Sequence, residues 1–214
     1  VAIATSRLEA AISIIRVSGP DCIAFVQKFF TGKILEKPSH TINYGFIIDE
    51  GKKIDEVLVN IYRGKRTFTG EEMVEINCHG GVYITSKVLE VCIKNGARIA
   101  ERGEFSKRAF LNGRIDLSQA EAVIDVIKSK TDKAQEVAQN QLEGSLANKI
   151  KSLRLKVTEV LAQLEVSIDF SDEDVEDVTY KEIEEKSLEL REEIKKLYDS
   201  AESGKILRDG LKTV

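Results

Sequence analysis

The sequence has few of the residues that build metal sites or disulfide frameworks. Its three cysteines, Cys22, Cys78 and Cys92, form no Cys-x-x-Cys pair, so neither a disulfide framework nor a zinc site is indicated. A reducing, cytoplasmic setting is the default expectation for such a chain. Only two histidines are present, His40 and His79, which argues against a histidine-based metal site.

Long apolar runs and a phosphate-binding loop are also lacking. No apolar stretch approaches the ~20 residues of a membrane helix, and no signal-peptide pattern is present, so we expect no membrane contact. The Gly-Lys at 204–205 is not part of the Gly-x-x-x-x-Gly-Lys-[Ser/Thr] pattern, and we expect no nucleotide site in these residues. The first residue is Val rather than Met, which suggests a trimmed start.

The composition itself is that of a folded, highly charged protein. The 214 residues are 42% hydrophobic and 32% charged, with a net charge of −4, as in globular domains. Residues 1–116 carry 17 Lys/Arg against 14 Asp/Glu, whereas residues 117–214 carry 15 against 22. An anionic ligand or RNA is therefore expected to meet the first part, although ordinary surface charge explains the asymmetry equally well.

Hydrophobic periodicity divides the chain into two parts. In residues 1–116, alternating or short apolar runs predict strands and flanking helices, which is an α+β pattern with a mixed sheet. The predicted strands are 11–17, 42–48, 54–62 and 73–78, and the predicted helices are 20–30 and 82–94. In residues 117–214, apolar residues recur at helical spacing and predict an all-α domain.

Three apolar stripes define the predicted helices of the second part. They run from Leu117 to Leu142, from Leu146 to Ile168 after a Gly-Ser break, and from Ile183 to Ala201. Such long amphipathic helices need a partner surface. Gly204 is expected to end the third helix unless the apolar residues after it prolong it. The acidic run at 169–177 lacks the ligand order of a calcium loop and is interpreted as a solvated connector.

The most specific polar pattern is Gly-Glu-Phe-Ser-Lys-Arg-Ala-Phe-Leu-Asn-Gly-Arg-Ile-Asp-Leu-Ser-Gln-Ala-Glu-Ala at 103–122. It joins a short basic helix, an Asn-Gly turn, Arg114 and a new helix start. Asp116 and Ser118 both fit as the cap of that helix, and Glu121 follows Ser118 at the capping-box distance. Packing alone does not explain so many specific polar residues around one turn.

Two charged side chains interrupt predicted strands. Glu75 shares a strand face with Met73 and Asn77, where a carboxylate could bind a heterocycle edge such as that of a pterin. The spacing alone favours a solvent-facing Glu or a buried salt bridge over this role. Arg16 interrupts an apolar strand, and a cation there is seldom buried unless it is paired. It fits the anionic part of a ligand or an arginine of an edge strand. Arg114 follows a turn, where cations are commonly just exposed.

The adjacent Cys78 and His79 invite comparison with a catalytic pair. Neighbouring residues of a strand point to opposite faces, so the two side chains cannot readily meet. We therefore interpret Cys78 as a core residue and His79 as a turn residue.

Three segments together resemble the MnmE (TrmE) family, the tRNA-modification GTPases that act on the wobble uridine. They are residues 12–19 (Ile-Ser-Ile-Ile-Arg-Val-Ser-Gly), residues 68–81 (Phe-Thr-Gly-Glu-Glu-Met-Val-Glu-Ile-Asn-Cys-His-Gly-Gly) and residues 103–122. With the downstream helices, the resemblance covers nearly the whole chain. It implies that residues 1–116 form a folate-binding and dimerisation domain similar in fold to that of aminomethyltransferases. It also implies that residues 117–214 form the first part of a helical domain, with the GTPase domain absent.

The resemblance also implies ligands, partners and site residues. A reduced folate, 5-formyl-tetrahydrofolate, is expected to meet Arg16, Glu75 and Arg114; the last position is often Lys in the family. The parent protein is expected to be a homodimeric, cytoplasmic GTP hydrolase that works with the flavoprotein MnmG. Together they would add an aminomethyl-type group at C5 of the wobble uridine (U34) of certain tRNAs. Its GTP, Mg²⁺ and K⁺ are expected in the GTPase domain, so no catalytic residue is assigned within 1–214.

One segment departs from the family pattern. Where the family usually has Ala-Thr-Pro-x-Gly-x-Gly, residues 4–10 read Ala-Thr-Ser-Arg-Leu-Glu-Ala, which changes the expected loop geometry. Two alternatives stay open beside the family prediction. One is an interaction scaffold without a small-molecule site, used for dimerisation or RNA docking. The other is an aminomethyltransferase-type folate enzyme.

Overall fold

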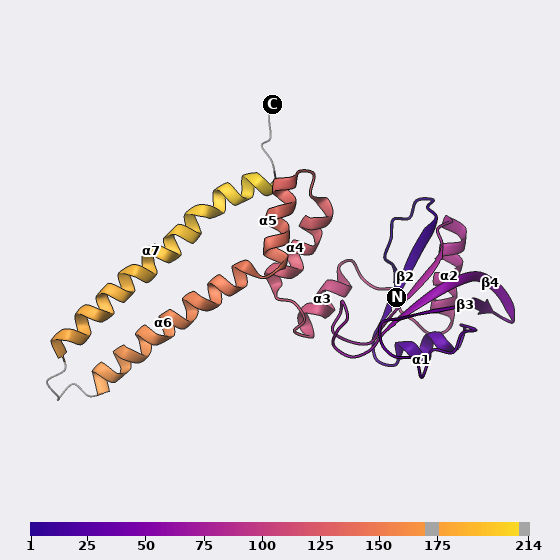
Figure 1. The fold of residues 1–214 in the computed structure, drawn as a ribbon, viewed down its shortest axis with the longest axis horizontal. Coiled ribbons are helices and arrows are strands. Elements are labelled where there is room, and N and C mark those ends of the chain that lie inside the picture. The colour runs from indigo at the N-terminus through magenta and orange to yellow at the C-terminus, as the bar shows by residue number, and fades with distance from the viewer. Residues whose placement is uncertain (170–175, 210–214) are drawn as a thin grey trace, which may run out of the picture. The chain divides into compact units, whose positions relative to one another are not determined.

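The computed structural model describes residues 1–169 and 176–209 (Figure 1). The chain forms two compact units, Val1–Ile115 and Asp116–Val214. The first combines a sheet with helices and the second is helical, so the predicted α+β class followed by an all-α part is confirmed.

A five-stranded sheet organises the first unit, in the order β1-β2-β5-β4-β3. The strands are β1 (Ala2–Ile3), β2 (Ile12–Ser18), β3 (Thr41–Asp49), β4 (Lys52–Tyr62) and β5 (Met73–His79). Every neighbouring pair in this sheet is antiparallel, so the predicted mixed sheet is wrong. The reason is topological. Short connections join β3 to β4 and β4 to β5 as antiparallel neighbours, and the long connection after β2 ends at the far edge instead of beside β2.

The two faces of the sheet have different roles. Val57, Val59 and Ile61 of β4 are buried, as their alternation predicted. They share one core with α1 (Cys22–Gln27) and α2 (Val82–Lys94). Alternate residues of the same strands point to the opposite face, which leaves that face free for polar side chains.

Helix α1 is shorter than predicted. It ends at Gln27, whose amide Nε2 donates to the carbonyls of Phe30 and Gly32, at 3.1 and 2.8 Å. Its Oε1 accepts from the N–H of Ile34 at 2.8 Å. Phe30 is buried beyond the helix and bridges to β3. The apolar positions were correctly predicted to lie inside, but the Gln27 side chain satisfies backbone groups that helical bonds would otherwise use.

The second unit contains two helical hairpins. The stripe predicted from Leu117 to Leu142 is split into α4 (Leu117–Lys128) and α5 (Asp132–Leu142). The Thr131 hydroxyl caps the second of these by accepting from the N–H of Ala134. Helices α6 (Ser145–Asp169) and α7 (Glu176–Asp209) run side by side in Figure 1 and bury a common row of apolar residues.

Helix α7 continues past the predicted stop at Gly204. The predicted acidic connector, residues 169–177, lies mostly outside the described residues. No helix within residues 1–169 and 176–209 is at once long and apolar enough to cross a membrane.

The start of α4 decides between the two predicted caps. Asp116 is the N-cap, and its carboxylate accepts from the N–H of Gln119 at 2.9 Å. The Gln119 side chain accepts from the N–H of Asp116 in return, also at 2.9 Å, which completes a capping box. Ser118 lies inside the helix and donates to Asp116, so the alternative cap built on Ser118 and Glu121 is wrong.

A substitution at Gly80 would test how tightly residues 4–11 pack on the end of β5. An added Cβ would lie 2.3 Å from the carbonyl oxygen of Ala10, a backbone atom that cannot rotate away. We expect Gly80→Ala to lower the free energy of unfolding by about 1–3 kcal/mol, as overpacking does. Calorimetric unfolding of the whole chain measures the change.

The neighbouring Gly81 provides the matched control, because an added Cβ there meets nothing within 4 Å. Gly81→Ala loses some N-cap preference but gains from a less flexible unfolded chain, and the two effects offset within about 1 kcal/mol. Equal destabilisation by the two variants would show that the close approach of the Ala10 carbonyl to position 80 does not affect the free energy of unfolding.

Candidate functional site

The three predicted site residues converge on one cavity of about 670 Å³ on the open face of the sheet. Arg16 comes from β2 and Glu75 from β5, where the two are register partners. Arg114 comes from the turn after α3 (Glu104–Leu111). The remaining lining residues are His40, Tyr62, Lys65, Arg66, Thr67, Phe68 and Met73. The role of the three residues in binding stays a prediction, but their proximity is a property of the fold.

Arg16 and Glu75 form a half-buried ion pair. The Nε and Nη2 atoms of Arg16 donate to Oε1 of Glu75 at 3.0 and 2.7 Å. The other oxygen, Oε2, accepts from the Tyr62 hydroxyl at 3.1 Å. A carboxylate has about four acceptor positions, so Oε2 retains room for a further donor. Glu75 thus forms the salt bridge that was one of the alternatives for it from the sequence, and its carboxylate also lines the cavity.

Two aromatic rings flank the Arg16 guanidinium. Its central carbon lies 4.9 Å from the ring centroid of Phe68 and 5.5 Å from that of Phe105. Such cation–π contacts hold an arginine without using its hydrogen-bond donors. Arg16 can therefore stay in place when Glu75 or a ligand competes for its N–H groups.

Asn60 adds an acceptor beside the ion pair. It lies opposite Glu75 in the β4–β5 register, and its Oδ1 is buried without a hydrogen-bond partner in the part of the chain that the structure describes. A buried acceptor without a partner is costly, but Asn60 does not itself line the cavity. Sequence reasoning missed Asn60, although its alternation with Val59 and Ile61 placed it on the open face.

Sequence reasoning also missed the aromatic residues Phe68 and Phe105. Both lie in segments that carry the family resemblance, and neither belongs to the apolar core. The signal that could have found them is an aromatic residue in an otherwise polar motif, at a position that the predicted core does not include.

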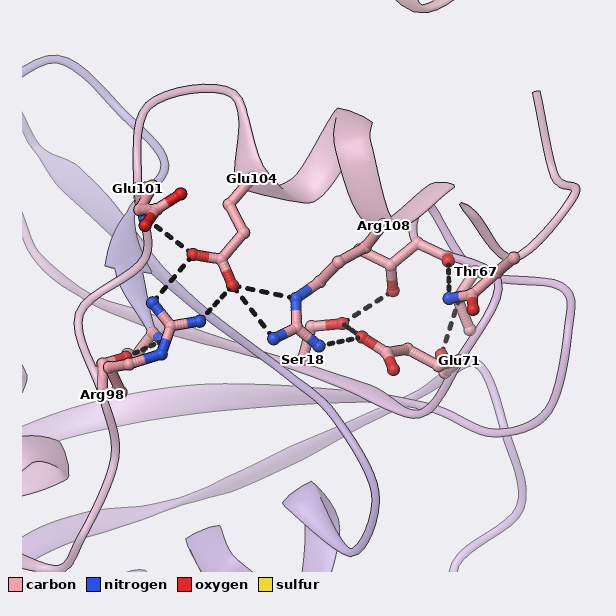
Figure 2. Close-up of polar contacts among 10 residues, drawn as sticks. Ser18, Thr67, Glu71, Arg98, Glu101, Glu104 and Arg108 are labelled. Carbon is pink, nitrogen blue, oxygen red and sulfur yellow. Dashed lines mark hydrogen bonds and ion pairs between the residues drawn. The ribbon is translucent and has the colours of Figure 1, made fainter. Parts of the chain in front are cut away.

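A network of charges holds the walls of the cavity together. Figure 2 shows the Glu104 carboxylate between the guanidinium groups of Arg98 and Arg108. Arg108 donates to Oε1 of Glu104 through Nε at 3.1 Å and Nη2 at 2.9 Å. Oε2 accepts from the backbone N–H of Glu101 at 2.7 Å. Because Glu104 is only 8% exposed, these donors replace the water that a charged carboxylate needs.

The network continues from α3 to the sheet. Arg108 also donates to Oε1 of Glu71 at 3.0 Å, and the Ser18 hydroxyl donates to the same oxygen at 2.7 Å (Figure 2). Helix α3 is thereby fastened to residues 63–72, between β4 and β5, and to the end of β2. One of these segments carries Phe105 and another carries Phe68, so the network fixes both rings around Arg16.

The turn that carries Arg114 is fixed separately. The amide Nδ2 of Asn112 donates to the carbonyl of Thr69 at 2.7 Å. Gly70 has a φ of 74°, and a Cβ there would lie 3.0 Å from that of Asn112. The specific polar residues of the 103–122 motif therefore position the cavity walls, which packing of apolar groups would not do.

Cys78 and His79 point apart, as predicted, but His79 is the last residue of β5 and not a turn residue. The Cys78 thiol is buried and donates to the carbonyl of Ser13 at 3.4 Å, whereas His79 is exposed and its Nδ1 lies 2.7 Å from Asp55 Oδ1. Burial raises the pKa of the Cys78 thiol to about 11, so it is a poor nucleophile at neutral pH. Within the described residues no group of three His, Cys, Asp or Glu side chains could hold a metal ion.

The altered segment at residues 4–10 lies beside a different cavity. Ser6, Arg7 and Leu8 line a space of about 200 Å³ next to α2, and none of the residues at 4–10 lines the Arg16–Glu75 cavity. The departure from the family pattern therefore does not alter the lining of the candidate site.

Comparison with known proteins gives matches over both units. A family model described as GTP-binding protein TrmE N-terminus matches residues 1–114, and the MnmE helical domain model matches residues 117–212. The tRNA modification GTPase MnmE of Clostridioides difficile (strain 630) is 57% identical over 217 residues, covering 100% of this chain and 47% of that protein. The protein of that name from Staphylococcus aureus (strain Newman) is 53% identical, covering 99% and 47%. The chain thus spans about half the length of these relatives.

Glu104 gives the network a pH signature. Hydrogen bonding from Arg98, and then from the Glu101 backbone, lowers the pKa of the Glu104 carboxyl from 4.5 to about 2. The ionised Glu104 carboxylate therefore makes its full contribution to the free energy of unfolding above the ordinary pKa. This contribution is lost as the pH falls from about 4.5 towards 2. We expect Glu104→Gln to lower the free energy of unfolding at neutral pH by about 1–3 kcal/mol. The free energy of unfolding of the variant should also decrease less than that of wild type as the pH falls from about 4.5 towards 2.

Calorimetric unfolding across this pH range, with hydrogen exchange of α3 as a local probe, measures the effect. Glu36→Gln, at an exposed position between α1 and β3, is the matched control and should leave both unchanged. If the free energy of unfolding of Glu104→Gln fell with acid pH as steeply as that of wild type, this carboxylate would not hold the network.

Proposed function

The chain belongs to the MnmE (TrmE) family, and from this premise we propose that its first unit binds a reduced folate such as 5-formyl-tetrahydrofolate. The observation that carries the proposal is the convergence of Arg16, Glu75 and Arg114 on one cavity. Arg16 and Glu75 are joined by their ion pair, and Arg114 reaches the same cavity from a distant part of the sequence.

The chemistry of the cavity matches a pterin edge. Such an edge presents a ring N–H and an amino group, which are donors and need acceptors nearby. Glu75, which lines the cavity, keeps acceptor capacity on Oε2. The ring of Phe68, which lines the cavity, provides apolar surface for a heterocycle. Arg114 is exposed and suits a carboxylate at the other end of the ligand.

The activity of the whole protein is proposed from its relatives. They are described as tRNA modification GTPases, which favours this role over an aminomethyltransferase-type enzyme. We place GTP hydrolysis, with Mg²⁺ and K⁺, in the parts of the relatives outside the matched region. The reaction would add an aminomethyl-type group at C5 of the wobble uridine of tRNA, with MnmG as partner, in the cytoplasm. Residues 1–214 contribute the folate cavity and the helical scaffold.

We also propose that the first unit forms a homodimer through the open face of its sheet. Tyr44 and Leu58 are register partners on this face, and with Ile42 they are 60, 46 and 68% exposed. A cluster of exposed apolar residues on a sheet face is typical of an interaction surface. This cluster lies next to the cavity in the register, because Asn60 is paired with both Ile42 and Glu75.

Folate binding is tested by removing either charge of the ion pair. We expect Glu75→Ala and Arg16→Ala each to weaken 5-formyl-tetrahydrofolate binding by on the order of tenfold or more, because each removes charge-assisted hydrogen bonds of about 1.5–3 kcal/mol. Titration calorimetry on the 214-residue chain measures the affinity. Glu56→Ala removes a carboxylate of β4 that does not line the cavity and serves as control. Wild-type protein that binds no reduced folate would favour the scaffold alternative.

Dimer formation is tested by placing a charge in the apolar cluster. We expect Leu58→Glu to convert a dimer into a monomer, since a buried unpaired carboxylate is strongly unfavourable in an interface. Light scattering on the whole chain measures the mass. Tyr198→Glu, at a 78% exposed position of α7, should leave the dimer intact. A dimer that persists in Leu58→Glu and is lost in Tyr198→Glu would move the interface to the helical unit.

A further inference from the structure

The cavity is surrounded by more positive charge than its own residues neutralise. Four lining residues, Arg16, Lys65, Arg66 and Arg114, are cations, and Glu75 is the only carboxylate of the lining. Arg16 is already bonded to Glu75. In the part of the chain that the structure describes, the side chains of the other three cations have no hydrogen bond or ion pair. Three exposed, uncompensated cations therefore surround one opening.

Lys65 and Arg66 are presented by a loop tip that is anchored on both sides. Before the tip, the Arg63 guanidinium donates to the carbonyl of Lys37 at 3.1 Å, and its backbone N–H donates to Ser39 at 2.8 Å. After the tip, the buried Thr67 donates to the carbonyl of Glu71 at 2.7 Å. The tip is thus held in position, while the side chains of Lys65 and Arg66 have no hydrogen-bond or ion-pair partner among the residues that the structure describes.

Gly64 allows the chain to turn between the anchors. Its φ of 70° is a conformation that glycine adopts without strain. The contrast among the neighbouring cations is informative, because Arg63 is used for structure whereas Lys65 and Arg66 are not. Free cations of this kind attract an anionic ligand and add both affinity and a higher association rate.

We propose that the ligand of this cavity carries a chain of several carboxylates, as a poly-γ-glutamyl folate does, and that Lys65 and Arg66 bind this chain. The inference rests on the proposed folate function and specifies the form of the ligand. A single glutamate offers two carboxylates, which Arg114 and one further cation would match. Each added γ-glutamyl residue brings one more carboxylate, so a longer tail can use all three cations.

RNA is the other polyanion that these cations could meet, but the arrangement favours a small molecule. Three of the free cations line a single cavity that also contains Glu75 and Phe68, whereas binding to a nucleic-acid backbone uses basic groups distributed along a surface. The excess over the whole of residues 1–116 is small, with 17 Lys/Arg against 14 Asp/Glu.

The test compares two forms of one ligand on the whole chain. Titration calorimetry measures binding of the monoglutamyl and pentaglutamyl forms of 5-formyl-tetrahydrofolate in about 0.05 M and about 0.5 M salt. We expect the pentaglutamyl form to bind on the order of tenfold more tightly at low salt, with the advantage shrinking at high salt because exposed charges are screened.

The double variant Lys65→Gln/Arg66→Gln should remove the tail advantage, leaving the two forms within about twofold of each other. Its affinity for the monoglutamyl form should stay within about threefold of wild type, because the pterin contacts are untouched. The matched control is Lys52→Gln/Lys53→Gln, at the opposite end of β4, which should keep the full advantage.

The outcomes separate the inference from the function on which it rests. Equal affinity of both forms for wild type, or a tail advantage that survives in Lys65→Gln/Arg66→Gln, would overturn the tail site while leaving folate binding in place. Failure of both forms to bind would overturn both proposals. The cations would be assigned to RNA instead if a short single-stranded RNA bound the wild-type chain, lost its binding in Lys65→Gln/Arg66→Gln, and the pentaglutamyl folate bound no more tightly than the monoglutamyl form.

Discussion

The Glu104 carboxylate is the group on which the candidate site depends. It lies between two arginines that would otherwise repel each other, and one of them continues to Glu71 and Ser18. Removing a single negative charge would leave two cations facing one another across a nearly buried position. Because α3 carries Phe105 and residues 63–72 carry Phe68, the geometry around Arg16 follows from this one compensation of charge.

Two sets of cations in the first unit differ in how their charge is neutralised. Arg63, Arg98 and Arg108 bond to carbonyls and carboxylates of the fold, and they set the positions of loops and helices. Lys65, Arg66 and Arg114 line the cavity and have no hydrogen-bond or ion-pair partner among the described residues. The same residue types therefore differ in use, and only their partners in the folded state distinguish the cations that hold the fold together from those that remain unpaired.

Local patterns allowed much of the fold to be predicted, because they depend on near neighbours in the chain. Alternation in β4 and β5 placed Val59 inside and Glu75 on the open face, and the Asn-Gly pair marked the turn before Arg114. The antiparallel strand order was not predictable in this way, because pairing of β2 with β5 joins residues far apart in sequence. The break at residues 129–131 was missed since the apolar stripe keeps its phase across it. Both Asp116 and Ser118 carry oxygens suited to a cap, and the choice depended on the reach of the Gln119 side chain.

The sequence separations of these contacts have a consequence for the synthesis of the protein. Arg16 meets Glu75 across 59 positions, and Arg108 meets Glu71 across 37. A chain emerging from the ribosome therefore has most of its sheet before it has α3, and during that interval Phe68 lacks its opposing ring. Non-local contacts of this kind form late because the intervening chain must first be ordered. Arg114 is the last residue of the cavity lining along the chain, so the lining is complete only after residue 114 has been synthesised.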